Sequence, residues 1–280
     1  MKKISRRSFL AAAAVSAAAL ALTACGGSAS TASSAAASSV AASSEAASTS
    51  AAAAELTTVE AGKLTMATNA TFPPYEMTTD AGTIEGIDVD TAQAIAEKLG
   101  LELQIDDMDF DAALLSVQQG KADIAMAGIT VTDERKAVMD FSDSYATGIQ
   151  SIIVPNDSDI ASPDDLAGKK IGTQRGTTGY IYCSDDFGDE NVVAYDDGLT
   201  AVQALNNGQV DAVVIDNAPA QEFVAANPGL KVLDTSYAEE DYAIGMAKGS
   251  ALEDAVNKAL EELKADGTLQ AIVDKYINAN

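Results

Sequence analysis

Short apolar strands alternate with amphipathic helices from about residue 60 onward, and this alternation restricts the possible folds more than any other feature. Such a chain builds a sheet covered by helices, because the apolar face of each element must be buried against another element. The first set of expected elements is the strand 63–68, the helix 88–99, the strand 101–105, the helix 111–119 and the strand 123–127. We therefore expect an α/β fold with largely parallel strands.

The pattern starts again near residue 151 and is long enough for a second core. Its expected elements are the strand 151–154, the strand 170–173, a helix near Thr178, the strand 191–195, the helix 199–206, the strand 212–215, the helix 218–226 and the strand 231–233. One more strand at 242–247 and two helices at 252–264 and 268–277 follow. The pattern alone is compatible with two separate domains or with two lobes that share segments.

The first 24 residues have the features of an export signal. Four basic residues precede an apolar stretch, 9–22, that is short for a membrane span. The sequence Leu22-Thr23-Ala24-Cys25 then resembles a lipobox, which predicts cleavage before Cys25 and lipidation of that cysteine. The alternatives are an ordinary signal with a chance cysteine, and twin-arginine export through the Arg6-Arg7 pair.

Residues 25–59 read as the lipidated cysteine and a disordered tether. Within 26–54, 23 residues are Ala or Ser, and only Val40 is a larger apolar residue. Such a segment cannot bury enough surface to offset the entropy lost on ordering. It would give an anchored domain reach above a membrane.

Charge and composition exclude several classes of function. The formal charge is −25, and removal of the basic signal makes the exported product more acidic still, which argues against nucleic-acid binding. The chain has no histidine, so a Ser-His-Asp triad and a His-based zinc site are excluded. With Cys25 lipidated, Cys183 has no partner for an intrachain disulfide and is expected to be a buried structural thiol. We expect neither a cofactor nor a metal.

The stretch Ala127-Gly-Ile-Thr-Val-Thr-Asp-Glu-Arg135 carries the most specific chemical signal. It follows an apolar strand, and Thr132 is a plausible N-cap with two acids in the first helical turn. Arg135 is a cation where the helix dipole disfavours one, unless it holds an anion there. The stretch therefore predicts a receptor for a small carboxylate. The alternative is a surface ion pair of Arg135 with Glu134 or Asp140, which would contribute little.

Three segments resemble the polar amino-acid-binding proteins of ABC importers, glutamine-binding proteins in particular. They are residues 126–145 (MAGITVTDERKAVMDFSDSY), the segment 86–90 (GIDVD) followed by Ile95, Ala96 and Leu99, and the segment 69–76 (NATFPPYE). The second segment departs from the family at Thr91, where a larger apolar residue is usual. The resemblance extends over about residues 60 to 280. It implies extracytoplasmic capture of a polar amino acid, delivery to a membrane permease with its ATPase, and no catalysis. We expect a lipid-anchored monomer at the outer face of the cytoplasmic membrane.

The resemblance also implies a two-lobe fold of the type II periplasmic-binding-protein class. The chain would cross between lobes twice, near 145–148 and near 238–242. One lobe would then combine residues 60–146 with 242–280, and the other would hold 147–241. A hinge of two strands permits closure around a ligand.

In α/β sheets, ligands bind beyond the carboxyl ends of the strands, and several candidate residues lie there. By resemblance, Arg135 and Thr130 would take the ligand α-carboxylate, and the Gly128 carbonyl would accept from the α-ammonium. Phe72 and Phe110 would enclose the aliphatic part of the side chain, although aromatic residues at such places are often core residues.

The second lobe would supply the remaining contacts. Gly176-Thr177-Thr178-Gly179 opens a helix and offers free N–H groups to the carboxylate, but it lacks the lysine of a P-loop. Asp216 would pair with the α-ammonium, or would cap the helix that follows it.

Three departures bear on the ligand side chain. Glutamine binders typically have an acid at the position of Asn69, a lysine at Gln174 and a histidine at Ile215. With none of the three positions charged, we expect a polar, uncharged amino acid, with cystine and glutamate as competitors. Two other functions stay open: a sensory or adhesive surface lipoprotein with the same fold, and an enzyme resembling the cyclohexadienyl dehydratases.

Overall fold

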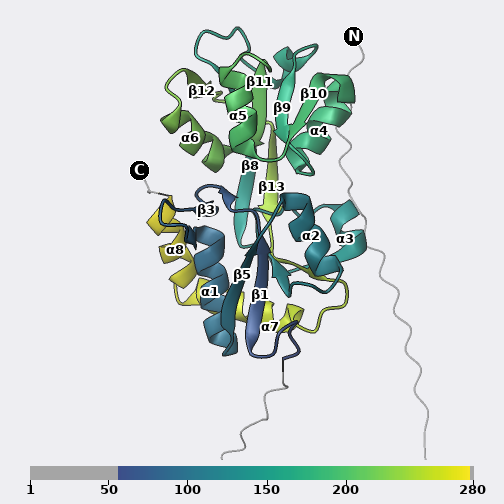
Figure 1. The fold of residues 1–280 in the computed structure, drawn as a ribbon, viewed down its shortest axis with the longest axis vertical. Coiled ribbons are helices and arrows are strands. Elements are labelled where there is room, and N and C mark those ends of the chain that lie inside the picture. The colour runs from purple at the N-terminus through teal and green to yellow at the C-terminus, as the bar shows by residue number, and fades with distance from the viewer. Residues whose placement is uncertain (1–55, 278–280) are drawn as a thin grey trace, which may run out of the picture. The chain divides into compact units, whose positions relative to one another are not determined.

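The computed structural model describes residues 56–277 (Figure 1). The expected signal peptide, the lipidation site at Cys25 and nearly all of the tether lie outside the described residues. Within the described part, no helix has the length and apolar character needed to cross a membrane.

The first lobe is built on a five-stranded sheet in the order β5-β1-β6-β14-β7. Its strands are β1 (Lys63–Thr68), β5 (Glu102–Asp107), β6 (Ile124–Ala125), β7 (Met139–Phe141) and β14 (Gly245–Ala247). β1 pairs in parallel with β5 and β6, whereas β14 is antiparallel to both β6 and β7. Segments from the beginning and the end of the described chain therefore share one sheet.

Helices cover both faces of this sheet, because successive residues of a strand point to opposite sides. Met66 belongs to the apolar cluster with α1 (Ile87–Leu99) and α7 (Glu253–Ala265), and α8 (Thr268–Tyr276) packs on both helices. Its neighbour Ala67 belongs to the cluster with α2 (Phe110–Gln118) on the other face. This double coverage explains why the strand residues are apolar without alternation.

The second lobe repeats this arrangement on a sheet in the order β10-β9-β11-β8-β12. The strands are β8 (Ala146–Pro155), β9 (Ile171–Gln174), β10 (Val192–Tyr195), β11 (Ala212–Asp216) and β12 (Leu230–Val232). Val214 packs with Cys183 of α4 (Thr178–Phe187) on one face, and Val213 packs with α5 (Gly198–Asn206) and α6 (Asn217–Ala226) on the other. Two short 3₁₀ helices, η1 (Pro163–Leu166) and η2 (Asp189–Asn191), lie in its loops.

Two strands join the lobes: β8 leads into the second lobe and β13 (Ala238–Tyr242) leads back (Figure 1). They pair antiparallel, with Ala146 opposite Tyr242 and Gln150 opposite Ala238. Tyr242 is fully buried, and a Cβ at Gly148 would lie 2.4 Å from its ring. A glycine at 148 therefore lets the large ring pack directly on the crossing strands.

Three features differ from the sequence-based expectation. The expected strand 242–247 is two strands, because the chain leaves the pairing with β8 at Tyr242 before β14 joins the first sheet. Both sheets are mixed, since β8 and β14 run against their parallel neighbours. A small sheet of β2 (Thr71–Phe72), β3 (Glu76–Thr78) and β4 (Ile84–Glu85) was not predicted, because two-residue strands carry no periodic signal.

Cys183 is fully buried in α4, as expected for a structural thiol. It lies in the apolar cluster of the second lobe with Ile152 and Val154. Burial raises the pKa of this thiol to about 12, so it stays protonated and unreactive at neutral pH.

Candidate functional site

Arg135 lies where the sequence predicts, in the first turn of α3 (Asp133–Val138). The Thr132 side chain caps this helix by accepting from the Arg135 N–H at 3.2 Å. The guanidinium is turned inward and only 9% of the residue is exposed. Its Nη1 donates to the Thr130 carbonyl at 2.7 Å, and its Nη2 donates to the Gly176 carbonyl at 3.1 Å. The side chain therefore reaches from the first lobe to the second.

The surface ion pair considered for Arg135 is wrong. Asp140 pairs with Lys248 at 2.6 Å, and no carboxylate among residues 56–277 forms an ion pair with Arg135. Burial lowers the pKa of the guanidinium from its ordinary value, and the nearby Glu240 carboxylate opposes this shift. Since an arginine keeps its proton in proteins, Arg135 is a buried cation whose side-chain hydrogen bonds go to carbonyl oxygens. Such a group has a strong electrostatic preference for an anion beside it.

Of the two buried aromatic rings expected at the site, Phe110 lies beside this cation and Phe72 lies against Gly128. The Phe110 ring, at the start of α2, has its centroid 5.4 Å from the Arg135 guanidinium carbon. Phe72 of β2 lies against Gly128, whose φ is +55° and where an added Cβ would be 2.7 Å from the ring. Gly128 therefore allows both the left-handed backbone and the close approach of Phe72.

Threonines from both lobes meet next to Arg135. The Thr130 and Thr178 hydroxyl oxygens are 3.3 Å apart, and the Thr178 hydroxyl also donates to Glu240 at 3.0 Å. Thr177 is the N-cap of α4: its oxygen accepts from the Tyr180 N–H and its hydroxyl donates to the Gln174 carbonyl. The Thr177 hydroxyl is thus occupied by its own helix, whereas Thr178 faces the space between the lobes.

Asn69 and Gln174 connect the lobes directly. Gln174 Nε2 donates to Asn69 Oδ1 at 2.9 Å, and both residues are buried. Asn69 Nδ2 donates to the Met108 carbonyl at 2.9 Å, which fixes the orientation of its amide. With the bonds of Arg135 and Thr130, this contact holds the two lobes together around the predicted site.

Asp216 is at the end of β11 and is 8% exposed. It occupies the N-cap position of α6, but its side chain makes no capping hydrogen bond, so the capping role considered for it is wrong. The carboxylate instead accepts from the Tyr242 hydroxyl. Burial raises the pKa of Asp216 to about 7, with the Tyr242 bond opposing and Glu240 adding to the shift. A neighbouring cation would lower this pKa and favour the charged form.

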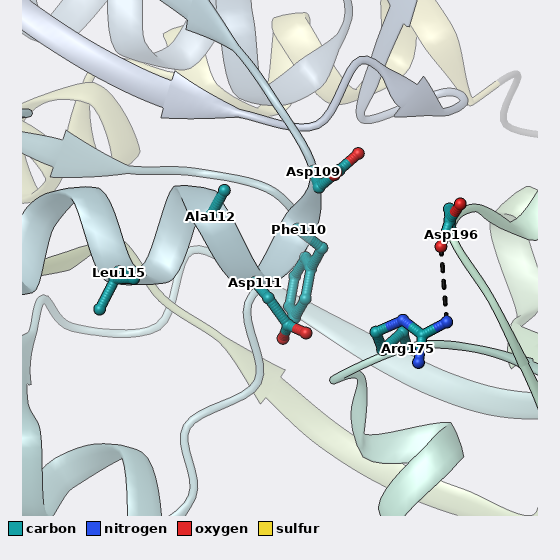
Figure 2. Close-up of a pocket in the computed structure, with 7 residues that line it drawn as sticks. All are labelled: Asp109, Phe110, Asp111, Ala112, Leu115, Arg175 and Asp196. Atoms are coloured by element: carbon teal, nitrogen blue, oxygen red, sulfur yellow. Dashed lines mark ion pairs between the residues drawn. The ribbon is translucent and has the colours of Figure 1, made fainter.

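A cavity of about 290 Å³ opens between the lobes beside Phe110. Figure 2 shows Arg175 of the second lobe opposite Phe110 and Asp111, which come from the start of α2. Asp109, Ala112, Leu115 and Asp196 complete the lining. Arg175 pairs with Asp196 at 3.5 Å and is largely exposed, as expected for a solvated arginine.

Three buried polar residues of the crossing strands were not predicted from the sequence: Gln150, Glu240 and Tyr242. Glu240 of β13 accepts from Gln150 of β8 at 2.9 Å as well as from Thr178. Tyr242 closes β13 and donates to Asp216. No motif marks these residues, because their roles depend on the pairing of two strands about 90 residues apart.

Residues 64–279 match the model of one protein family, the bacterial extracellular solute-binding proteins, family 3. The chain belongs to this family. The match includes all three of the segments that resemble amino-acid-binding proteins of ABC importers, and that resemblance is thereby confirmed.

Three similar proteins illustrate what the family contains. The L-cystine-binding protein TcyJ of Escherichia coli (strain K12) is 33% identical over 225 residues, covering 79% of this chain and 85% of that protein. An ancestral arginine-binding protein bound to glutamine has a TM-score of 0.74 and 42% identity, covering 77% of this chain and 98% of that one. The amino acid ABC transporter substrate-binding protein AbpA of Streptococcus pneumoniae Canada MDR_19A, bound to L-arginine, has a TM-score of 0.73 and 37% identity, covering 77% and 94%. The expected two-lobe α/β fold class is thus confirmed.

If Asp216 faces the ligand ammonium, as the resemblance implies, amino-acid affinity should depend on pH. Protonation of Asp216 below about pH 7 removes the negative charge that would face an ammonium group, so affinity should fall with falling pH. The fall should approach about tenfold per pH unit for one coupled proton. Isothermal titration calorimetry from about pH 5 to about pH 8 measures it. In Asp216→Asn, binding should be weaker and this component of the pH dependence should disappear.

The stability of the free protein should have the opposite dependence on pH. Because the pKa of Asp216 in the folded state is raised above the ordinary 3.8, the folded state holds a proton that the unfolded state releases. The free energy of unfolding should therefore decrease as the pH rises from about 4 to about 7.

Affinity that does not change with pH would contradict the placement of Asp216 at the ammonium.

Proposed function

We propose that this protein captures a zwitterionic amino acid with a polar side chain between its two lobes and delivers it to an ABC permease. The buried guanidinium of Arg135 carries the proposal, because it lies between the lobes with two carbonyl partners and, within residues 56–277, no carboxylate partner. Family membership supports the transport role, since the similar AbpA is an amino acid ABC transporter substrate-binding protein. A permease and an ATPase are the implied partners, and the protein would act as a monomer.

The ligand α-carboxylate would bind a positively charged group of the protein, and the α-ammonium would bind a negatively charged one. Arg135 and Thr130 would hold the carboxylate, together with Thr178 and the free N–H groups at the start of α4. Asp216 and the Gly128 carbonyl would hold the ammonium. A pocket that offers one buried cation and one buried anion selects zwitterions over simple acids or amines, since either group left unpaired costs several kcal/mol.

The side chain would extend between Phe72 and Phe110 toward Asn69 and Gln174. Thr177, which caps α4 with its side chain, belongs to the helix start that would face the carboxylate. Asn69 and Gln174 already bond to each other across the lobes, which places two uncharged amides at the far end of the site. This supports a polar, uncharged side chain, with cystine and glutamate as competitors.

Capture would require the lobes to open and close. We propose that the division falls at the crossings, with residues 60–146 and 242–280 in one lobe and 147–241 in the other. The pairing of β8 with β13 supports this division, because these strands are the connection between the two sheets. Bending of two paired strands is a common means of closure around a ligand. A sensory or adhesive lipoprotein would bind an amino acid at the same site but would not deliver it to a permease. An enzyme resembling the cyclohexadienyl dehydratases would convert its ligand to a product, and a turnover assay would detect this.

Arg135→Ala should weaken amino-acid binding by roughly 2–5 kcal/mol, because it removes one partner of a desolvated ion pair. The free protein should melt at nearly the same temperature, since the loss of the two Arg135–carbonyl hydrogen bonds is offset by removal of a buried, unneutralised charge. Isothermal titration calorimetry and thermal unfolding measure the two quantities. Arg175→Ala is the matched control, because this exposed arginine should leave affinity nearly unchanged. Wild-type affinity in Arg135→Ala would refute the carboxylate assignment.

The tightest-binding neutral polar amino acid should bind at least about a hundredfold more tightly than arginine or lysine, roughly 2.7 kcal/mol, because Asn69, Gln174 and Ile215 offer no charge to a cationic side chain. Asn69→Asp should narrow that gap, since an aspartate keeps the acceptor for Gln174 and adds a negative charge. Competition binding with the amino acids and cystine measures the order. If arginine or lysine wins on the wild type, Asp109, which lines the adjacent cavity, becomes the counter-ion to test by Asp109→Asn.

We also propose that the protein is exported and anchored by lipid at Cys25, at the outer face of the cytoplasmic membrane. The lipobox-like sequence at 22–25 and the Ala- and Ser-rich segment after it support this. Cys25→Ser should bind amino acids normally but lose membrane association. Membrane fractionation in high salt measures it, and a fully processed Cys25→Ser protein that stays with membranes would contradict lipid anchoring.

A further inference from the structure

Asp88, in the first turn of α1, lies fully buried behind the proposed ammonium position. One of its oxygens, Oδ2, accepts two hydrogen bonds. The Gly128 N–H donates to it at 3.0 Å, and the Tyr145 hydroxyl donates to it at 2.8 Å. Gly128 is the residue whose carbonyl would face the ligand ammonium, and Tyr145 directly precedes the crossing strand β8. A single carboxylate oxygen therefore ties the ligand turn to the crossing.

Glu76 of β3 is fully buried beside Asp88. No donor group of the described residues bonds to either oxygen of Glu76 or to Oδ1 of Asp88. A proton held by Glu76 and donated to Asp88 would give one oxygen of each carboxyl group a partner. Burial raises the pKa of Glu76 far above its ordinary value and the pKa of Asp88 to about 6, as expected for a pair with a single proton and a single negative charge.

The backbone holds this pair in place. Gly86, the N-cap of α1, has a φ of +142°, and a Cβ there would lie 2.1 Å from the Tyr75 carbonyl oxygen. This close approach brings the first turn of α1 onto the strand that carries Glu76. Glu76 in turn pairs with Phe72 in the small sheet, so the acid pair backs an aromatic wall of the site.

We propose, on the basis of the proposed function, that Asp88 is the positioning residue of the ammonium subsite and Glu76 its proton-holding partner. Asp88 acts through Gly128. Its charged Oδ2 holds the N–H of the peptide group between residues 127 and 128, and this fixed peptide group orients the Gly128 carbonyl that follows it. It also places a second buried negative charge on the first lobe, facing the same position that Asp216 faces from the second lobe. Tyr145 shares the same oxygen, so the hinge and the ligand turn depend on one group.

The other titratable groups around the pair are tyrosines and acids. Tyr145 and Glu76 contact Asp88 directly, and Tyr75, Asp107 and Asp216 act on the pair electrostatically. No lysine or arginine of the described residues forms an ion pair with Asp88 or Glu76. An arriving ammonium would therefore not have to displace an ion-paired side chain from this charge.

The test uses the free protein and then glutamine, or the tightest amino acid of the competition panel. In the free protein, the NMR shift of the Gly128 amide should change with pH in step with Asp88, with a midpoint near 6. Asp88→Asn should abolish this change and weaken amino-acid binding roughly tenfold to a hundredfold, because a charge-assisted bond becomes a neutral one. Glu76→Gln keeps a donor to Asp88, so the Gly128 amide shift should still follow the titration of Asp88 in this variant.

Two further variants keep the test decisive. Asp90→Asn, two residues along the same helix, removes a surface ion pair with Lys275, keeps an acceptor for the Tyr276 hydroxyl, and should change neither the Gly128 shift nor the affinity. Tyr145→Phe removes a donor that lowers the pKa of Asp88, so the Gly128 midpoint should move to higher pH. This variant decides the matter even if Asp88→Asn does not fold. A Gly128 shift that ignores pH, or wild-type affinity in Asp88→Asn, overturns the inference. If no amino acid binds the wild type, the proposed function fails, but the Gly128 titration still tests the Asp88 contact.

Discussion

The site depends on one buried cation held by backbone carbonyls from two different lobes. Arg135 bonds the Thr130 carbonyl in its own lobe and the Gly176 carbonyl in the other, and no carboxylate of residues 56–277 pairs with it. These carbonyl dipoles satisfy two of the N–H groups of the guanidinium without neutralising its charge. The remaining polar groups of the site follow from this, since Thr130, Thr178 and the start of α4 all lie around the same unneutralised charge.

The acids of the site are arranged to compensate that cation without pairing with it. Glu240 of β13 opposes the lowering of the Arg135 pKa by burial, but it accepts its hydrogen bonds from Gln150 and Thr178. Asp216 is occupied by Tyr242, and Asp88 by Gly128 and Tyr145. Each carboxylate thus has neutral donors as partners and forms no ion pair with the guanidinium.

Local chemistry allowed the sequence to predict Arg135 and its helix. A threonine N-cap, two acids and a misplaced cation follow one another within four residues, and the structure shows the predicted cap and the inward arginine. Asp216 shows the limit of local rules: its position predicts a cap, but the Tyr242 hydroxyl takes its side chain. Glu240 and Gln150 were out of reach, because they meet only when β8 and β13 pair. The mixed sheets were missed for the same reason, since strand direction depends on how often the chain crosses between lobes.

The hydrogen bond between Asn69 and Gln174 would compete with any ligand side chain that bonds to these two amides. These two amides satisfy each other at 2.9 Å when nothing lies between them. An incoming side chain that inserts there must offer each amide a partner as good as the one it displaces. A hydrocarbon chain would replace none of the bond lost between the two amides, whereas a terminal carboxamide has one acceptor and two donors to replace it. Binding at this end of the site would then exchange one set of hydrogen bonds for another. Each candidate side chain would be selected by how well its hydrogen bonds to Asn69 and Gln174 replace the bond between these two residues in the free protein.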